Sequence, residues 1–282
     1  MITNRILKAL KNPEKIIPYI RNRYAPIVAT NPQDSKFTFS DLFIWRCDNH
    51  WKTIYELFPY ICLLSKKDEH PNIEECKSRL VILSNDGTLI AESRIEFEPT
   101  RKSSLNIADY IPSSISSYQY GTFMIFHENI PRKEILNGGY LTDRGYTSYG
   151  FGSSNTLSFV HGNLDAVSGK YSNGGIEELT YLKSTFLKRS FQLQYLFTPI
   201  NSYEIAITNP TCKSHKVCLN FFNNKGEKFH SIEIELSTLG VRILQLPSFE
   251  YNFLISIRSN LHMARPLIFK LTNQKLVDVF HG

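Results

Sequence analysis

The sequence lacks most of the features that assign a chain to a known class of enzyme. Its five cysteines are odd in number and include no close pair of the kind that binds zinc. No apolar run approaches the ~20 residues of a membrane-spanning helix, and no secretory leader or usable Asn-x-Ser/Thr site occurs. We therefore expect reduced, mostly buried thiols and a cytoplasmic protein with no cofactor and no metal.

Catalytic motifs are also missing. The sequence has no Gly-rich phosphate loop, no Gly-x-Ser-x-Gly elbow and no His-Glu-x-x-His metal motif. The eight histidines are dispersed, but His161 and His281 occupy matching places in a repeat described below. This match favours a structural role for both and leaves a catalytic or metal role open. The sequence alone does not decide whether the chain is an enzyme.

What the chain does contain is a repeated hairpin. Residues 79–97 read RLVILSNDGTLIAESRIEF, and residues 217–236 read VCLNFFNNKGEKFHSIEIEL. In each copy an apolar run meets Asn-x-Gly, whose residues tolerate the positive φ of a tight turn. Each returning strand alternates apolar and polar residues, the period of a sheet with one face in water.

The segments around the two hairpins recur in the same order. The matched pairs are 43–46 with 203–208, Leu105/Ile107 with Leu244/Leu246, 121–128 with 251–258, and 157–162 with 277–282, and residues 52–75 have no counterpart. We therefore predict an all-β fold of two tandem β-sandwich domains of similar topology with a short N-terminal amphipathic helix. The predicted divisions are a helical segment at 1–30, one domain at 37–165 and another at 188–282, joined by a Gly- and Ser-rich connector at 163–175.

Charge concentrates at the N-terminus. The first 24 residues carry +5 of the net +6, because Glu14 offsets one of six cations. These cations lie beside apolar residues at helical spacing: Arg5, Lys8, Lys11, Lys15, Arg21 and Arg23. Such a segment suits the anionic inner face of the cell membrane. The alternative is a helix packed on the protein with a solvated basic face. We expect no nucleic-acid partner, because the cations are not interleaved with a folded aromatic platform.

A resemblance adds a biological context. The phrases ILKALKNPEKIIPYI, FIWRCDN, SFVHGN, QYLFTPINSYEIAITNPT, ARPLIF and DVFHG resemble uncharacterised two-β-sandwich proteins associated with bacterial surface-polysaccharide loci. The first phrase is also similar to the leading segments of some peripheral glycan-assembly enzymes. The resemblance implies a glycan or a glycan-assembly enzyme as partner, and it implies no catalytic residue.

A candidate ligand site follows from comparing the two copies, because residues found in only one copy need a reason other than the shared scaffold. Copy one adds aromatic and polar residues at 43–51 and 137–155, a mixture that suits sugar recognition. The predicted contacts are Trp45, Arg46, Asp48, Arg144, Tyr146, Tyr149 and His161. The alternative is an aromatic loop that only covers the core.

These observations predict an accessory or glycan-binding protein in bacterial surface-polysaccharide synthesis or modification, peripheral at the membrane. Two alternatives stay open. One is a hydrolase or lyase whose site lies on the first domain, with Trp45, Arg46, Asp48, His127 and His161 converging. The other is a structural protein-interaction module.

Overall fold

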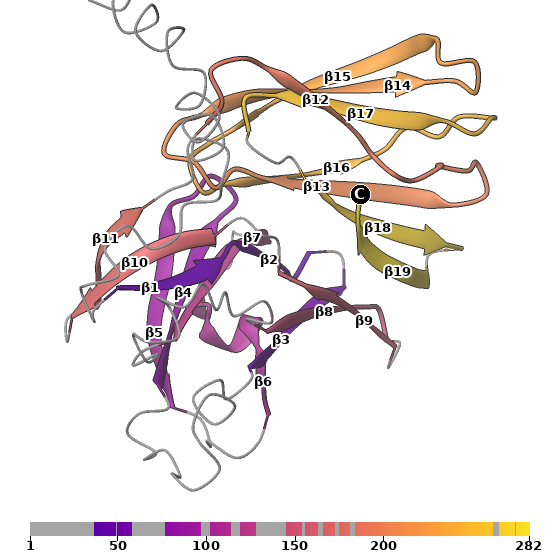
Figure 1. Ribbon diagram of the computed structural model, residues 1–282. Helices are drawn as coiled ribbons and strands as arrows, with labels where there is room; N and C mark the ends of the chain where they lie inside the picture. Colours follow the sequence, from indigo (N-terminus) through magenta and orange to yellow (C-terminus); the bar gives the residue numbers. More distant parts are fainter. Residues whose placement is uncertain are drawn as a thin grey trace, which may run out of the picture.

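The computed structural model describes residues 37–48, 50–57, 77–96, 102–113, 119–127, 145–153, 156–162, 166–172, 175–180, 184–261, 265–273 and 275–282 (Figure 1). The predicted N-terminal helix, with Arg5, Lys8, Lys11, Lys15, Arg21 and Arg23, lies outside these ranges, as does Arg144. The described chain consists of antiparallel strands and one short 3₁₀ helix, η2 (Ile107–Tyr110). The all-β prediction is confirmed.

The first part of the chain forms two four-stranded sheets. One has the order β2 (Phe43–Arg46), β7 (Tyr120–His127), β4 (Lys77–Ser84) and β5 (Leu89–Glu96). The other has the order β6 (Ser103–Asn106), β3 (Trp51–Leu57), β8 (Tyr146–Phe151) and β9 (Leu157–His161). Their facing side chains form one buried cluster that includes Phe43, Trp45, Tyr55, Ile82 and Phe123. We call this pair of sheets the first sandwich.

The second part repeats the arrangement. One sheet has the order β12 (Arg189–Gln192), β17 (Leu254–Ser259), β14 (His215–Phe222) and β15 (Lys228–Leu236). The other has the order β16 (Val241–Gln245), β13 (Ser202–Thr208), β18 (Leu267–Thr272) and β19 (Lys275–His281). A cluster that includes Phe197, Ile205, Leu219, Phe221 and Ile257 fills the space between them. We call this pair the second sandwich.

The strand orders of the two sandwiches correspond strand for strand, so the repeat seen in the sequence is a repeat of topology. The predicted hairpins are β4–β5 and β14–β15, and Gly87 and Gly226 take the expected positive φ of 86° and 78°. One pairing was wrong by a strand: 43–46 corresponds to 189–192, whereas 203–208 corresponds to β3. Residues 51–57 therefore do have a counterpart, which is β13.

A third sheet covers the outside of the first sandwich. It has the order β1 (Phe37–Asp41), β10 (Ala166–Ser172) and β11 (Gly175–Thr180). The Ser40 hydroxyl accepts the Ile125 N–H of β7 at 2.8 Å, which ties β1 to the sandwich. Residues 163–175 were predicted as a connector from their Gly and Ser content, but most of them are strand, since pairing with β1 supplies their hydrogen bonds.

The two sandwiches share a buried apolar contact, which we call the seam. It joins side chains of the first sandwich to the outer face of the β16–β13–β18–β19 sheet. The buried residues of the seam are Ile44, Trp51, Tyr149, Val160, Ala206, Val241, Leu267, Phe269, Leu271 and Val279. Figure 1 shows the second sandwich lying across one end of the first. The sheet of β13 and β18 is therefore buried on both faces.

A leucine on a turn fixes a second point of contact. Leu239, with φ of 55°, inserts between residues of the first sandwich that include Leu83, Met124 and Phe126. Its carbonyl accepts the Thr122 hydroxyl at 2.6 Å. The β4–β5 turn also lies against this leucine turn, because a Cβ added at Gly87 would be 1.9 Å from the Thr238 carbonyl.

Three of the five cysteines lie in the described ranges. None of the three is in a disulfide, and Cys47 and Cys212 are exposed while Cys218 is half-buried. The expectation of mostly buried thiols is therefore wrong for these three. Cys47 and Cys212 lie in short segments between strands, where side chains are more often exposed.

Candidate functional site

Trp45 is a core residue of the first sandwich. It is 1% exposed, and its indole N–H donates to the Leu83 carbonyl at 2.8 Å. Phe43 and Trp45 face the core of the first sandwich, whereas Ile44 faces the seam, as the alternation of a strand requires. Among the predicted ligand contacts, Trp45 therefore lies on the opposite face of β2 from Arg46.

Arg46 is the centre of a charged cluster at the seam. Its guanidinium donates to both carboxylate oxygens of Asp48 and to a carboxylate oxygen of Glu204, which belongs to the second sandwich. The guanidinium carbon lies 4.3 Å from the ring centroid of Trp51 and 4.7 Å from that of Phe269. Arg46 thus makes a bidentate ion pair, a second ion pair and two cation–π contacts at once.

The electrostatics of this cluster keep Arg46 charged. Burial lowers its pKa, but the hydrogen bond to Asp48 and the charges of Glu204 and Asp48 outweigh burial, so the pKa is raised overall. The exposed fractions of the side chains are 1% for Arg46, 9% for Asp48 and 16% for Glu204. The cluster holds one cation and two carboxylates away from most solvent, and it joins residues 158 positions apart in the sequence.

Tyr149 also belongs to the seam. It is fully buried, its hydroxyl donates to the Ile44 carbonyl at 2.8 Å, and its ring meets Phe269 edge-on at 5.1 Å. Burial raises the pKa of its phenol well above the usual value. Tyr149 therefore locks β8 to β2 and packs on the second sandwich, and its hydroxyl is committed to a backbone partner.

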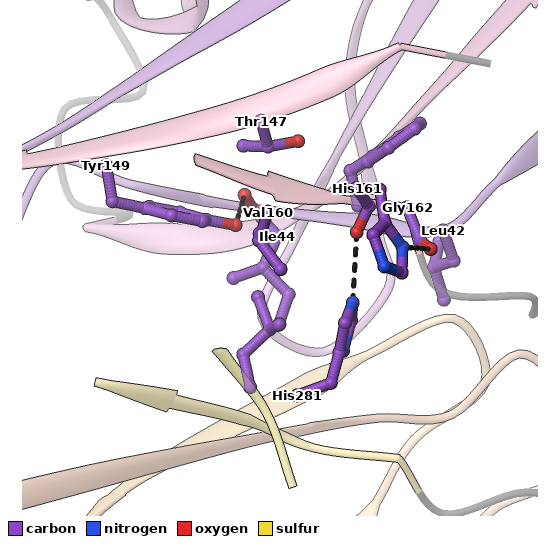
Figure 2. Close-up of a pocket in the computed structure, with 10 residues that line it drawn as sticks. Leu42, Ile44, Thr147, Tyr149, Val160, His161, Gly162 and His281 are labelled. Atoms are coloured by element: carbon purple, nitrogen blue, oxygen red, sulfur yellow. Dashed lines mark hydrogen bonds between the residues drawn. The ribbon is translucent and has the colours of Figure 1, made fainter. Parts of the chain in front are cut away.

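A small cleft opens beside Tyr149 at the edge of the seam (Figure 2). Its lining residues come from both sandwiches: Leu42, Phe43, Ile44, Thr147, Tyr149, Val160, His161, Gly162, Leu267 and His281. The cleft has a volume of about 10 Å³, roughly the room that one water molecule needs. A sugar ring does not fit such a volume, since ligand pockets usually begin at about 300 Å³.

The matched histidines of the two copies meet at this cleft. Their ring centroids lie 5.1 Å apart, and Nε2 of His281 is 3.0 Å from the His161 carbonyl oxygen. Burial, with Arg265 and His161 nearby, lowers the pKa of His281 to about 4. In the described part of the chain, Nδ1 of His281 has no hydrogen-bond partner. The pair closes the last strands of both sandwiches, the structural role that the repeat favoured.

The remaining candidates do not gather around Arg46. Tyr146 and His161 are cross-strand neighbours on β8 and β9, half-buried and exposed respectively. His127 lies at the far end of β7 from Tyr120, the residue that pairs with Arg46. His127 is seven positions further along the strand than Tyr120, a distance of roughly 23 Å. The five residues of the hydrolase or lyase alternative therefore do not converge.

The described ranges contain no group of three or more His, Cys, Asp or Glu side chains placed to hold a metal ion. No helix within them has the length and apolar character that crossing a membrane requires.

An aromatic cluster that the comparison of the two copies missed lies in the second sandwich, with one exposed ring and two half-buried rings. Tyr251 is 46% exposed and its ring is within 21° of parallel to Phe249, with centroids 6.1 Å apart. Phe229 meets Phe249 at 4.9 Å and Tyr251 at 5.3 Å, edge-on to both. We call Phe229, Phe249 and Tyr251 the aromatic shelf. Its signal in the sequence is the alternation of rings in SFEYNF (248–253).

The shelf is supported by the core on one side, and Tyr251 is its exposed member. Phe229 and Phe249 pack on the core of the second sandwich, and Phe249 is also 5.0 Å from Phe253 at its base. In the part of the chain that the structure describes, no group hydrogen-bonds the Tyr251 hydroxyl. The outermost ring therefore keeps one polar group for an external partner.

Comparisons with known proteins assign no family. No family model matches the chain, and no curated protein matches it. Among solved structures it is similar to a glycoside hydrolase family 2 member from Bacteroides cellulosilyticus, with 8% identity over 86% of this chain and 26% of that one and a TM-score of 0.17. It is also similar to a family 2 β-glucuronidase and to the Bacteroides uniformis β-glucuronidase. Both are 8% identical over 90% of this chain and 26% and 27% of theirs, with TM-scores of 0.15 and 0.14. The chain spans about a quarter of the length of each, and TM-scores this low carry no argument about function.

Proposed function

We propose that this protein is a non-catalytic, glycan-binding accessory protein of bacterial surface-polysaccharide synthesis or modification. The observation that carries the proposal is the aromatic shelf of Phe229, Phe249 and Tyr251. Flat rings suit the apolar C–H face of a sugar, and a free hydroxyl at the edge suits its polar rim. Because the shelf is supported by the core, the protein loses little conformational entropy when a glycan binds.

The hydrogen bonds made by three of the predicted site residues support a binding role over an enzyme. Arg46 and Asp48 bond to each other and Arg46 to Glu204, while Tyr149 donates to a backbone carbonyl. A catalytic group needs a reacting atom within hydrogen-bond reach. These groups are surrounded by protein in the seam, and the neighbouring cleft has only about 10 Å³.

A second binding surface on the first sandwich is kept as an alternative. Tyr146 and His161 lie opposite each other on β8 and β9, so their side chains share one face of the sheet. Arg144 precedes this strand in the sequence. We propose these three residues of the predicted ligand site as the contacts if the glycan binds copy one.

The test compares matched variants on a panel of neutral and acidic bacterial polysaccharides, by affinity electrophoresis and calorimetry. Tyr251→Ala should weaken binding about tenfold, since losing one stacked ring costs about 1.4 kcal/mol. Leu89→Ala is the control, because Leu89 is 58% exposed and lies outside both the shelf and the surface of Tyr146 and His161. Both variants should keep the melting temperature of the parent.

The other outcomes are decisive as well. If Tyr146→Ala weakens binding and Tyr251→Ala does not, the glycan binds the first sandwich. Equal affinities for the parent and both tyrosine variants would assign binding to neither surface. If the parent binds no polysaccharide of the panel, the glycan-binding proposal is wrong.

A further inference from the structure

A short bend at the start of the second sandwich presents two bare apolar side chains. Residues 184–188 lead into β12, and within them Phe186 is 90% exposed and Leu187 is 72% exposed. Leaving two large adjacent side chains in water forgoes the free energy of burying them. Two adjacent side chains exposed to this degree offer an apolar contact to something outside the chain.

The bend is held in place by one residue across the sheet. Asn260 donates from its side-chain amide to the carbonyls of Thr185 and Phe186, at 3.0 and 3.2 Å. The Thr185 N–H donates to the Asn260 carbonyl at 2.8 Å. The Thr185 hydroxyl also donates to the Leu187 carbonyl at 2.8 Å. The two apolar tips are therefore pre-ordered, which lowers the entropy cost of inserting them elsewhere.

The charges beside the bend select the partner. Lys188 follows directly and is exposed, and Arg189 begins β12. Aromatic and aliphatic tips with cations next to them are the arrangement that binds the interface of an anionic membrane. The six cations of the first 24 residues give the same chain a second basic segment.

The size of the patch argues against a second copy of the chain. Two side chains of this kind bury at most about 400 Å², whereas a stable protein interface buries about 800 Å² on each partner. A lipid surface needs no shape complementarity and gains from each inserted side chain separately.

We propose that Phe186 and Leu187 insert into the interfacial layer of an anionic membrane, with Lys188 at the headgroups. This contact is separate from the glycan shelf, so either proposal can fail without the other.

The direct test places a fluorescent probe at the tip. The chain has two native tryptophans, Trp45 and Trp51, which are 1% and 4% exposed and keep a constant background. Phe186→Trp in the full chain should shift its emission to the blue on vesicles of equal phosphatidylglycerol and phosphatidylcholine. Brominated lipid should quench it. Ile200→Trp is the control, because Ile200 is 79% exposed on another loop and should not respond.

Co-sedimentation with the same vesicles gives the magnitude. The pair Phe186→Ser and Leu187→Ser should reduce partitioning at least about tenfold, and Lys188→Gln should reduce it about fivefold at low salt. The double variant Leu89→Ser and Ile200→Ser changes two exposed apolar residues elsewhere in the chain and should leave partitioning unchanged. An unshifted Phe186→Trp emission, or unchanged partitioning of the Phe186/Leu187 pair, would overturn the proposal. Concentration-dependent dimers of the parent that the serine pair abolishes would also overturn it, in favour of a protein partner.

Discussion

Replacing Arg46 should lower the free energy of unfolding more than replacing either of its acidic partners. Arg46→Met keeps an unbranched, flexible stem but removes a cation that is 1% exposed. Asp48 and Glu204, 9% and 16% exposed, then face each other across the seam with no cation between them. Breaking a buried pair by removing one partner costs about 3–5 kcal/mol, and this range includes the lost contacts with Trp51 and Phe269.

The measurement is urea unfolding at neutral pH, followed by far-UV circular dichroism and by tryptophan fluorescence. With a urea m-value of ~3 kcal/mol/M for a chain of this size, the unfolding midpoint of Arg46→Met should lie about 1–1.7 M below that of the parent. Glu204→Gln should cost only about 1 kcal/mol, because the Arg46–Asp48 pair stays balanced and the amide oxygen still accepts a hydrogen bond. Fluorescence reports the first sandwich in particular, since it holds both Trp45 and Trp51.

A third variant separates charge imbalance from packing. Combining Arg46→Met with Asp48→Leu and Glu204→Leu leaves no charge in the cluster, so it should be more stable than Arg46→Met alone. If Arg46→Met is as stable as Glu204→Gln, or if the triple variant is the least stable of all, then the charged cluster does not hold the seam as described.

Two further predictions test the seam at other points. Leu239→Ala should lower the free energy of unfolding by about 2–4 kcal/mol, because Leu239 is 4% exposed in its cluster; Leu187→Ala is the control and should stay within about 0.5 kcal/mol, and equal effects of the two would contradict the insertion of Leu239. The pKa of His281 falls from 6.5 to about 4 on folding. The neutral imidazole therefore contributes about 3 kcal/mol to the free energy of unfolding above pH 6.5, and this contribution is lost as the pH falls toward 4. His281→Gln should flatten this part of the stability profile, and a parent profile that is already flat between pH 4 and 6.5 would show that the imidazole is not held neutral.

The residues of the candidate site show how far comparison of the two copies reaches. Copy one does carry extra groups at 43–51 and 145–162, and the structure brings these segments together through the Tyr149 hydroxyl and the Ile44 carbonyl. The reason for the extra groups is different from the predicted one for Arg46, Asp48 and Tyr149, because they contact the second sandwich or support that contact. Subtracting one copy from the other therefore located an interface between them. Ligand binding by Tyr146, His161 and Arg144 stays a prediction.

The sequence by itself determined the hairpins and their repetition. The Asn-x-Gly turns and the alternation of β5 and β15 act over a few residues, so neighbours along the chain carry the whole signal. The sequence also determined the order of the strands that follow the hairpins. Strand β2 shows the limit, since all four of its residues, Arg46 included, are buried, so no alternation of buried and exposed positions shows its register or its neighbour.

Only the tertiary structure decided what the polar and aromatic side chains do. Arg46 and Glu204 are 158 positions apart, and Phe229 and Tyr251 come from different strands and loops, so no local pattern places them in contact. Period-two alternation shows that Arg46 and Trp45 face opposite ways, but not which face of β2 meets a second sandwich and which meets its own core. That choice depends on the packing of whole sheets, where the free energy of burial is summed over surfaces that the chain brings together only on folding.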